Sequence, residues 1–380
     1  MTKARDLADF LGDNTSLNTI NNAYAAGTLV PSSTNPSLII NGDMKIAQRA
    51  TSSTSTSDGY VVVDRFFLQA QAGNNGTTSY SQSTDGPTGF ANSLKIECTS
   101  TDSVIGSTQY SRILYNIEGN VFSSLGGGTS WAKSFTVSFW VKSSLTGTYG
   151  VTTQNTDVTR GMAKDYTINS ANTWEYKTVT FTGDTSGTWA TDTSLGARIN
   201  FGLATGSSRG LAPSNTWSNF DARGSSNQVN WMATLGNTFY ITGIKVEEGS
   251  EATDFQHVSY ADELAKCQRY YQKFSAEDSI YQRYSTGICF SSSNCSTLTT
   301  LPVTMRVIPT LETSGTASHF AVLHKNSAVS TCSSIPTLST SGSNSTQMNI
   351  GCSTTGLTTN NVGQLIAKST SAYLAFDGEI

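Results

Sequence analysis

The stretch Phe135-Thr-Val-Ser-Phe-Trp-Val-Lys142 alternates apolar and polar side chains along its whole length. Successive side chains of a β-strand point to opposite faces of the sheet, so this alternation predicts one buried and one solvent-facing side. Antiparallel sheets commonly have such a wet face. Trp140 falls on the polar side of the strand, where we expect it either to be exposed or to pack beneath a loop.

Two later stretches have the same character. Val179 and Phe181 alternate with threonines, and Phe239-Tyr-Ile-Thr-Gly-Ile-Lys-Val246 forms a third run that Glu247-Glu-Gly249 ends. Clusters of turn-forming residues punctuate the chain between these runs. Many short antiparallel strands without intervening helices predict a jelly-roll β-sandwich, which we place at residues 37–257.

The composition favours a mainly β fold. Only 13% of the 380 residues are charged, against roughly 25% in an average soluble domain, and Ser, Thr, Asn and Gly are abundant. Hydrophobic residues still make up 37% and aromatic residues 10% of the chain, which argues against wholesale disorder. The length allows two or three domains, each with its own core.

The charge and hydropathy patterns exclude two classes of partner. The formal net charge is -4 and no basic stripe is present, so we expect no nucleic-acid binding. The sequence has no apolar run long enough to cross a bilayer, so we expect no membrane insertion. The start, Met1-Thr-Lys-Ala-Arg-Asp6, lacks the apolar core of a signal peptide, which predicts synthesis in a cytoplasm without export by that route.

The cysteines and histidines show no metal-binding pattern. None of the six cysteines forms a C-x-x-C pair, and the three histidines add no tetrahedral set. We therefore expect neither zinc nor any other cofactor. Free thiols are the simpler interpretation for a protein made in a reducing compartment. A Cys289–Cys295 or Cys332–Cys352 bridge is the alternative.

No catalytic constellation is visible in the sequence. A G-x-S-x-G elbow, a P-loop and an H-E-x-x-H motif are all lacking, and no pair of carboxylates is marked for glycoside hydrolysis. We therefore expect no enzyme activity. Asn41, Asp43 and Glu247 are weak candidates for a calcium site, with solvated loops as the alternative, and we predict no bound metal.

The first 36 residues are predicted to be a docking segment. Ala4, Leu7, Ala8 and Leu11 recur at helical spacing, and a glycine follows as a stop signal. A helix this short is unstable alone in water, so it must pack on another surface. We expect Leu7, Phe10 and Leu11 to dock. The polar segment up to residue 36 is interpreted as an extended arm, and packing of that arm on the first β domain is the alternative.

Residues 258–278 break the β pattern. Ser259 and Asp262 have the spacing of a capping box and predict a helix over 259–274. The apolar seam of that helix consists of Tyr260, Leu264, Tyr271 and Phe274. Packing of this seam on a neighbouring sheet and a three-fold contact between copies of the chain are the two interpretations. A second, smaller β domain is predicted over 279–380.

Stacking on aromatic rings is the binding chemistry that the sequence supports best. Trp189, Trp217 and Trp231 stand in polar, turn-rich surroundings. The apolar C–H face of a sugar lies well against an amphipathic indole ring, while its hydroxyls meet polar side chains. These three tryptophans are therefore candidate ligand-binding residues, with burial in the core of the sandwich as the alternative.

Several segments together carry a resemblance to a known family. They are Pro36-Ser-Leu-Ile-Ile-Asn-Gly-Asp-Met-Lys-Ile-Ala-Gln-Arg49 with Asp64-Arg-Phe66, Phe139-Trp-Val-Lys142, 239–255, Tyr260-Ala-Asp-Glu-Leu-Ala-Lys-Cys-Gln-Arg-Tyr-Tyr271, Leu301-Pro-Val-Thr-Met-Arg-Val-Ile-Pro-Thr310 and Ala372-Tyr-Leu-Ala-Phe376. This set resembles the bacteriophage tail fibres that contain a carbohydrate-binding-like jelly roll. The resemblance covers residues 36–380, and its motifs are specific as a set but weak singly.

The resemblance implies a protein of the virion surface, on the tail or the capsid. Such fibres are usually homotrimers whose N-terminal segment docks on other virion proteins and whose distal domain faces the host. The implied function is non-covalent adsorption to a host cell-surface glycan as a tail fibre or receptor-binding protein. A capsid-mounted fibre or decoration protein is the first alternative. A capsule-degrading enzyme is the second and weaker one, because the sequence shows no repeat of the kind that builds long β-helices.

Overall fold

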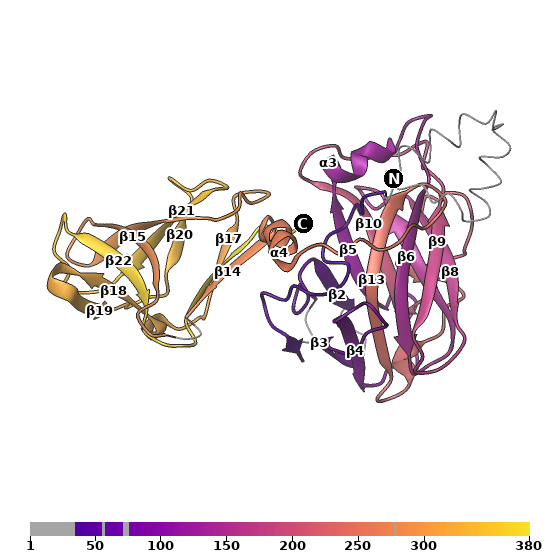
Figure 1. Ribbon diagram of the computed structural model, residues 1–380, viewed down its shortest axis with the longest axis horizontal. Coiled ribbons are helices and arrows are strands. Elements are labelled where there is room, and N and C mark those ends of the chain that lie inside the picture. The colour runs from indigo at the N-terminus through magenta and orange to yellow at the C-terminus, as the bar shows by residue number, and fades with distance from the viewer. Residues whose placement is uncertain (1–34, 55–57, 71–75, 277–278) are drawn as a thin grey trace, which may run out of the picture. The chain divides into compact units, whose positions relative to one another are not determined.

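The computed structural model describes residues 35–54, 58–70, 76–276 and 279–380, and most of the secondary structure within them is strand (Figure 1). Residues Ser37–Ile380 belong to one compact unit. The predicted docking residues Leu7, Phe10 and Leu11 lie outside the described residues. The prediction of a mainly β chain with a jelly-roll sandwich is confirmed.

Two antiparallel sheets form the first β region, and Figure 1 shows their strands side by side. The six-stranded sheet runs in the order β1 (Ser52–Ser53), β3 (Thr77–Ser83), β4 (Ser93–Ser100), β13 (Thr238–Glu248), β6 (Phe135–Ser143) and β9 (Glu175–Phe181). The five-stranded sheet runs in the order β2 (Phe66–Ala70), β5 (Tyr110–Glu118), β10 (Leu195–Thr205), β7 (Gly147–Gln154) and β8 (Gly161–Ile168).

Short elements connect these strands. They are α3 (Gly119–Phe122), the 3-10 turns η1 (Ser123–Leu125) and η2 (Trp231–Ala233), and the parallel pair β11 (Gly210–Leu211) and β12 (Gly224–Ser225). Helix α3 lies at one end of the sandwich (Figure 1). The connections are mostly loops, which is where binding residues are most often found.

The core lies between the two sheets and is built by the alternation seen in the sequence. On β6, Phe135, Val137 and Phe139 are at most 1% exposed, and they face β10 residues such as Phe201, whose ring lies 5.1 Å from that of Phe139. Burial of each such side chain stabilises the fold by roughly 1.5–3 kcal/mol. Because the inward residues are fixed in this way, Trp140 and its neighbours of the polar set point to the outer face.

Strand β13 contains a bulge that shapes this outer face. Its pairing with β6 runs from Phe239 to Thr242, breaks, and resumes at Lys245. Gly243 within the break has a φ of 61°, a left-handed conformation that glycine adopts without strain. The one extra residue lets Ile241 and Ile244 both enter the core, where neither is more than 2% exposed.

The connector differs from its prediction. Helix α4 spans Tyr260–Gln268, and Ser259 caps it by accepting a hydrogen bond from the Asp262 backbone N–H at 3.2 Å, as the capping box predicts. The expected helix over 259–274 is too long, because residues Tyr271–Ser275 form strand β14 instead. Their backbone groups pair in an antiparallel ladder with β23 (Tyr373–Asp377), which the local sequence does not reveal.

This correction divides the predicted oligomer seam. Tyr260 is 60% exposed on α4 and Leu264 is half-buried there. Tyr271 is only 2% exposed on β14, and the ring of Phe274 packs edge-on against Phe376 at 5.9 Å. The four residues therefore share no helical face, since two of them belong to a strand.

The second β region has two sheets of its own. The smaller contains β14, β23 and β17 (Thr310–Thr313). The larger runs in the order β19 (Ala328–Thr331), β18 (Phe320–His324), β22 (Val362–Ala367), β15 (Arg283–Cys289), β16 (Asn294–Thr300), β21 (Gln347–Ser353) and β20 (Thr337–Ser339), with turns η3 (Ala317–His319) and η4 (Lys325–Ser327). One hydrophobic cluster lies within residues 39–246 and a second within 276–376.

All six cysteines are free and buried. Cys295 lies opposite Cys289 on β15 and opposite Cys352 on β21, so three thiols neighbour one another in the second core. Burial raises the pKa of the Cys295 thiol to about 12 and that of Cys332 to about 11. Since the thiolate is the reactive form, these groups are poor nucleophiles.

Within the described ranges, no helix is long and apolar enough to cross a membrane. In the same part of the chain, no group of three or more His, Cys, Asp and Glu side chains is arranged to hold a metal ion.

Candidate functional site

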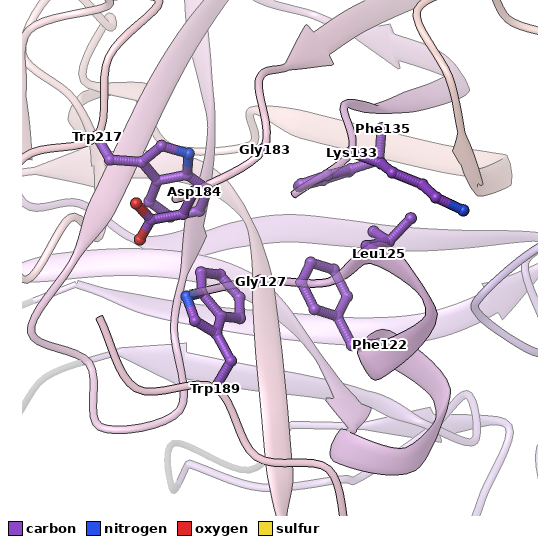
Figure 2. A pocket seen from close by; sticks show the side chains of 9 residues that line it. All are labelled: Phe122, Leu125, Gly127, Lys133, Phe135, Gly183, Asp184, Trp189 and Trp217. Carbon is purple, nitrogen blue, oxygen red and sulfur yellow. The ribbon is translucent and has the colours of Figure 1, made fainter. Parts of the chain in front are cut away.

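The structure brings two of the three candidate tryptophans together. Trp189 comes from the loop between β9 and β10, and Trp217 from the loop between β11 and β12. Their rings meet edge to face with centroids 5.3 Å apart. On its other side Trp189 stacks on Phe122 of α3, at 5.1 Å and an interplanar angle of 14° (Figure 2).

The space among the rings of this tryptophan cluster, defined as Phe122, Trp189 and Trp217, is too small for a ligand, although Trp189 and Trp217 are both half-buried. The Trp189 indole N–H donates to the Ser186 carbonyl at 3.1 Å, and the Trp217 indole N–H donates to the Thr182 carbonyl at 2.8 Å. The cavity among these rings has a volume of about 10 Å³, which is room for a single water molecule. The rings of Phe122, Trp189 and Trp217 thus pack on one another (Figure 2), and both indole N–H groups have backbone partners.

Trp231 lies elsewhere, in η2, with none of its surface exposed. Its indole N–H points to the Thr238 carbonyl at 3.4 Å. The ring belongs to the hydrophobic core of the sandwich, so it is not available as a platform for a ligand in this structure. Of the two interpretations that the sequence left open for Trp231, burial in the core is the one that the structure shows.

A different pair of rings is open, on the outer face of the six-stranded sheet. Trp140 on β6 lies directly opposite Tyr176 on β9 in the strand register. Residues opposite each other in an antiparallel pair have neighbouring side chains, and here the ring centroids are 5.4 Å apart. Tyr176 is 45% exposed, so the pair presents aromatic surface to solvent.

The pair lies in a groove with a volume of about 420 Å³, which is within the usual range for small-molecule sites. We call this site the Trp140 groove. Its floor is Ser138, Trp140, Tyr176 and Gly243, its aromatic wall is Phe90, Phe255 and His257, and its polar rim includes Thr88, Thr253 and Asp254. The three rings of the wall contact one another, with centroids 4.9 to 5.1 Å apart.

The β13 bulge sets the floor of the groove. A Cβ atom at Gly243 would lie 2.8 Å from the Phe90 ring and 3.1 Å from the Trp140 ring. Only a glycine therefore lets the two rings lie this close to the backbone of β13. The bulge thus joins the aromatic wall to the floor.

A buried ion pair holds the loop that carries Phe255 and His257 of the wall and the Thr253–Asp254 part of the rim. Lys245 and Glu247, on β13, lie 3.0 Å apart with side chains no more than 1% exposed. Glu247 accepts the Thr253 backbone N–H at 2.8 Å, and Lys245 donates to the Asp254 carbonyl at 3.2 Å. Each buried charge has a partner and further hydrogen bonds, as such groups require. The loop is thereby fixed beside Trp140.

The weak calcium candidates have other partners. Glu247 is engaged by Lys245 and Thr253, as described above. Asp43 pairs with Lys45 at 2.8 Å, and the Asn41 side chain donates to the backbone carbonyls of Ile46 and Asp64 at 2.9 Å. These side chains act in local structure, and they do not gather around one point.

A second aromatic pair continues the same face along β6. Lys142 follows Trp140 on the outer side, and its Nζ lies 4.3 Å from the centre of the Tyr240 ring and 5.3 Å from that of Trp174. Asp85 pairs with Lys142 and accepts the Trp174 indole N–H at 3.0 Å. The Lys142 hydrogen bond lowers the pKa of the Asp85 carboxyl. The outer face therefore carries a strip of rings with charged groups between them.

Sequence reasoning identified Trp140 only as a tryptophan on a polar face. The same signal, an aromatic residue among the threonines of an alternating strand, marks Tyr176 in Glu175-Tyr-Lys-Thr-Val-Thr-Phe181. No local signal marks Phe90, Phe255 or His257, since Phe90 reaches the groove from one loop and the other two from a loop far away in the sequence.

Neither a protein-family model nor a curated protein matches the sequence. Solved structures do match in the sandwich. The enzymatically active domain of tailspike protein 4 of bacteriophage CBA120 is 13% identical over 56% of this chain, with a TM-score of 0.29, and the chain spans 21% of that structure. The family 11 carbohydrate-binding module of a Clostridium thermocellum cellulase is 15% identical, with 53% of this chain and 97% of that one covered and a TM-score of 0.28.

A third match is TmCBM61 in complex with β-1,4-galactotriose, at 6% identity, 57% of this chain, 100% of that one and a TM-score of 0.29. Each of these likenesses covers little more than half of this chain. At such scores they say nothing of where this chain binds a ligand, or which one.

Proposed function

We propose that this protein binds a glycan in the Trp140 groove. The observation that carries the proposal is the Trp140–Tyr176 pair at the floor of an open groove of about 420 Å³. Aromatic side chains that line a pocket together with a few polar groups are typical of small-molecule sites. The groove is wide enough for a ligand, whereas the tryptophan cluster is not.

The chemistry of the groove suits a sugar. The apolar C–H face of a pyranose ring stacks on Trp140 and Tyr176, while its hydroxyls bind polar groups at the rim, such as Thr88 and the exposed Asp254. The buried Lys245–Glu247 pair holds the rim in place before the ligand arrives, which reduces the ordering cost of binding.

We further propose that the protein is a phage tail fibre or receptor-binding protein that adsorbs to a host cell-surface glycan without cleaving it. The sequence resemblance over 36–380 supports this role, and the groove supplies a surface for adsorption. In this proposal the protein is a homotrimer on the virion, and residues 1–36 attach it to other virion proteins. The antibody labelling described below distinguishes a place on the tail from one on the capsid.

A saccharide panel with matched variants tests glycan binding. Immobilised full-length protein is screened against host polysaccharides, and the best binder is titrated by calorimetry. Trp140→Ala is expected to weaken binding at least tenfold, since stacking on the floor is lost. Trp131→Ala is the control, because Trp131 is 60% exposed and lies outside the groove. Equal affinity of the two variants for the best ligand would overturn the site, and no binder in the panel would overturn the function.

Three further measurements test the oligomeric state, the position on the virion and adsorption without cleavage. Light scattering is expected to give three times the chain mass of 40.4 kDa, and the monomer mass contradicts the trimer. Antibody labelling of phage particles is expected at the tail, and label at the capsid vertices favours a decoration protein instead. Incubation with the bound polysaccharide is expected to leave its chain length unchanged, and any shortening overturns adsorption without cleavage.

A further inference from the structure

Four arginines gather on the outer face of the five-stranded sheet, on the side of the sandwich away from the Trp140 groove. Arg112 projects from β5 and Arg198 from β10, while Arg209 and Arg223 come from the segment between β10 and η2. The only carboxylate among the ion pairs of this group, within the described residues, is that of Asp221. We call this group the arginine cluster.

Asp221 pairs with two of the four arginines. It accepts Arg209 Nη1 at 2.6 Å, and it accepts Arg223 Nε at 2.8 Å and Nη2 at 2.7 Å. Arg223 also donates to the Tyr110 hydroxyl at 2.7 Å. The guanidinium groups of Arg112 and Arg223 lie 5.1 and 4.8 Å from the centre of the Tyr110 ring.

Arg112 and Arg198 have neutral hydrogen-bond partners instead. Arg112 is 2% exposed and donates to Gln69 Oε1 at 2.6 Å and to Asn200 Oδ1 at 2.8 Å. Half-buried Arg198 donates Nε to Asn116 Oδ1 at 3.2 Å. Over the part of the chain that the structure describes, neither arginine has a carboxylate within 4.0 Å.

Burial of the Arg112 and Arg198 charges is energetically unfavourable. Burial lowers the pKa of Arg112 to about 9, with repulsion from Arg223 as a further cause. The same two causes lower the pKa of Arg198. A buried charge without a counter-ion is unfavourable. An anion beside Arg198 would relieve that cost, because opposite charges favour the ionised form.

Two glycines of the sheet allow the loop that carries Asp221 and Arg223 to lie close to it. Gly150 and Gly202 lack side chains where the loop before η2 crosses the sheet, and a Cβ on either would lie within 2.5 Å of Ser225 or Gln228. The loop therefore lies directly on β7 and β10. That close approach places Asp221 and Arg223 beside Arg112, while Arg198 stays half-buried.

We propose that the arginine cluster binds the carboxylate or sulfate group of an acidic saccharide, with the Arg198 guanidinium as the group that contacts it. Guanidinium groups recognise planar and tetrahedral oxyanions through paired hydrogen bonds. A polyanion such as nucleic acid suits the chain less well, since its formal net charge is -4. One acidic group among neutral hydroxyls fits a local positive patch on an otherwise neutral or acidic surface. The site is separate from the Trp140 groove and does not require it.

Calorimetry with a matched pair of probes tests the proposal on the full chain. Tetragalacturonate supplies carboxylates, a sulfated carrageenan tetrasaccharide supplies sulfates, and galactotetraose is the neutral comparison. At least one acidic probe is expected to bind about tenfold more tightly than galactotetraose, which is the effect of one charge-assisted hydrogen bond. The preference is expected to shrink as salt is added.

Three variants locate that preference. Arg198→Gln is expected to remove it and to leave galactotetraose binding unchanged. Arg283→Gln removes the same charge from an exposed site on β15 and is expected to keep it. Trp140→Ala is expected to weaken galactotetraose binding and to keep the preference for the acidic probe, so failure of the groove and failure of the cluster can be told apart.

Unfolding curves of Arg198→Gln check that the variant is folded. Arg198→Lys keeps the charge but loses the paired donors. Its preference for the acidic probe is expected to lie between those of the wild type and Arg198→Gln. Equal affinity of wild-type protein for all three probes would overturn the proposal. So would equal losses in Arg198→Gln and Arg283→Gln. Stabilisation by inorganic sulfate without any preference for an acidic saccharide would also overturn it, since the cluster would then be a site for free anions.

Discussion

The tryptophan cluster and the Trp140 groove are both aromatic, yet only one of them is open. In the cluster, Trp189 and Trp217 come from loops that fold over each other, their indole N–H groups bind backbone carbonyls, and a cavity of about 10 Å³ remains. In the groove, Trp140 and Tyr176 stand opposite each other on paired strands, and their rings lie beside a space of about 420 Å³. The two sites thus differ in the space beside their rings, although Trp140, Trp189 and Trp217 are all half-buried.

The largest expected difference between the two sites is in stability. Trp189→Ala removes a ring that stacks on Phe122 and is expected to lower the free energy of unfolding by about 3 kcal/mol. Trp140→Ala is expected to lower it by about 1 kcal/mol, because its ring lies on the outer face. Urea unfolding of both variants measures the difference. Equal losses of unfolding free energy in the two variants would contradict the difference between the tryptophan cluster and the Trp140 groove.

A pair of glycine variants sharpens the comparison next. Gly243→Ala strains a left-handed residue and presses on the Phe90 and Trp140 rings, and it is expected to cost about 2 kcal/mol of stability and to weaken glycan binding. Gly236→Ala strains a similar φ of 78° with no atom near the new Cβ. It is expected to cost less and to leave affinity unchanged. If both variants bind the glycan equally, the bulge does not shape the site.

Tyr176 tests the open pair on its own. Tyr176→Ala is expected to weaken glycan binding about fivefold to tenfold, in line with about 1 kcal/mol for a lost stacking contact, and to change stability little, since the ring is 45% exposed. Tyr176→Phe keeps the ring and is expected to keep most of the affinity. Calorimetry with the best ligand measures both, and a loss in the Phe variant as large as that in the Ala variant would assign the effect to the hydroxyl instead.

The smallest expected effect concerns pH. The Lys142 hydrogen bond lowers the pKa of Asp85 in the folded protein, so the pair stabilises the fold above the ordinary Asp value and loses that contribution as the pH falls through the lowered value. Asp85 is well exposed, so the contribution is expected to be less than about 1 kcal/mol. Unfolding of wild type and Asp85→Asn should differ at pH 7 and converge as the pH falls through the lowered pKa of Asp85. A difference that grows at low pH would contradict the assignment.

The fold was predictable where the signal is local. Alternation in Phe135-Thr-Val-Ser-Phe-Trp-Val-Lys142 identifies both the core face and the outward position of Trp140, because strand geometry alone decides it. The end of α4 was not predictable in this way. Tyr271 leaves the helix to pair with β23 at Asp377, a partner about a hundred residues later in the chain.

The site was predictable only in part, for the same reason. Trp231 follows Asn230, which suggested a polar loop, but Asn230 caps the turn η2 by accepting the Met232 N–H at 3.1 Å, and the indole turns inward. The wall of the groove depends on the bulge in β13 and on the buried Lys245–Glu247 pair. Such long-range register leaves no mark in any short stretch of sequence.

Fluorine NMR on protein containing 5-fluorotryptophan tests the central claim most directly. The chain has six tryptophans, and single substitutions assign their resonances. On titration with the best-binding saccharide, the Trp140 resonance is expected to shift most, while those of Trp189, Trp217 and Trp231 stay in place. A shift at Trp189 or Trp217 with none at Trp140 would contradict the account and place the ligand at the tryptophan cluster.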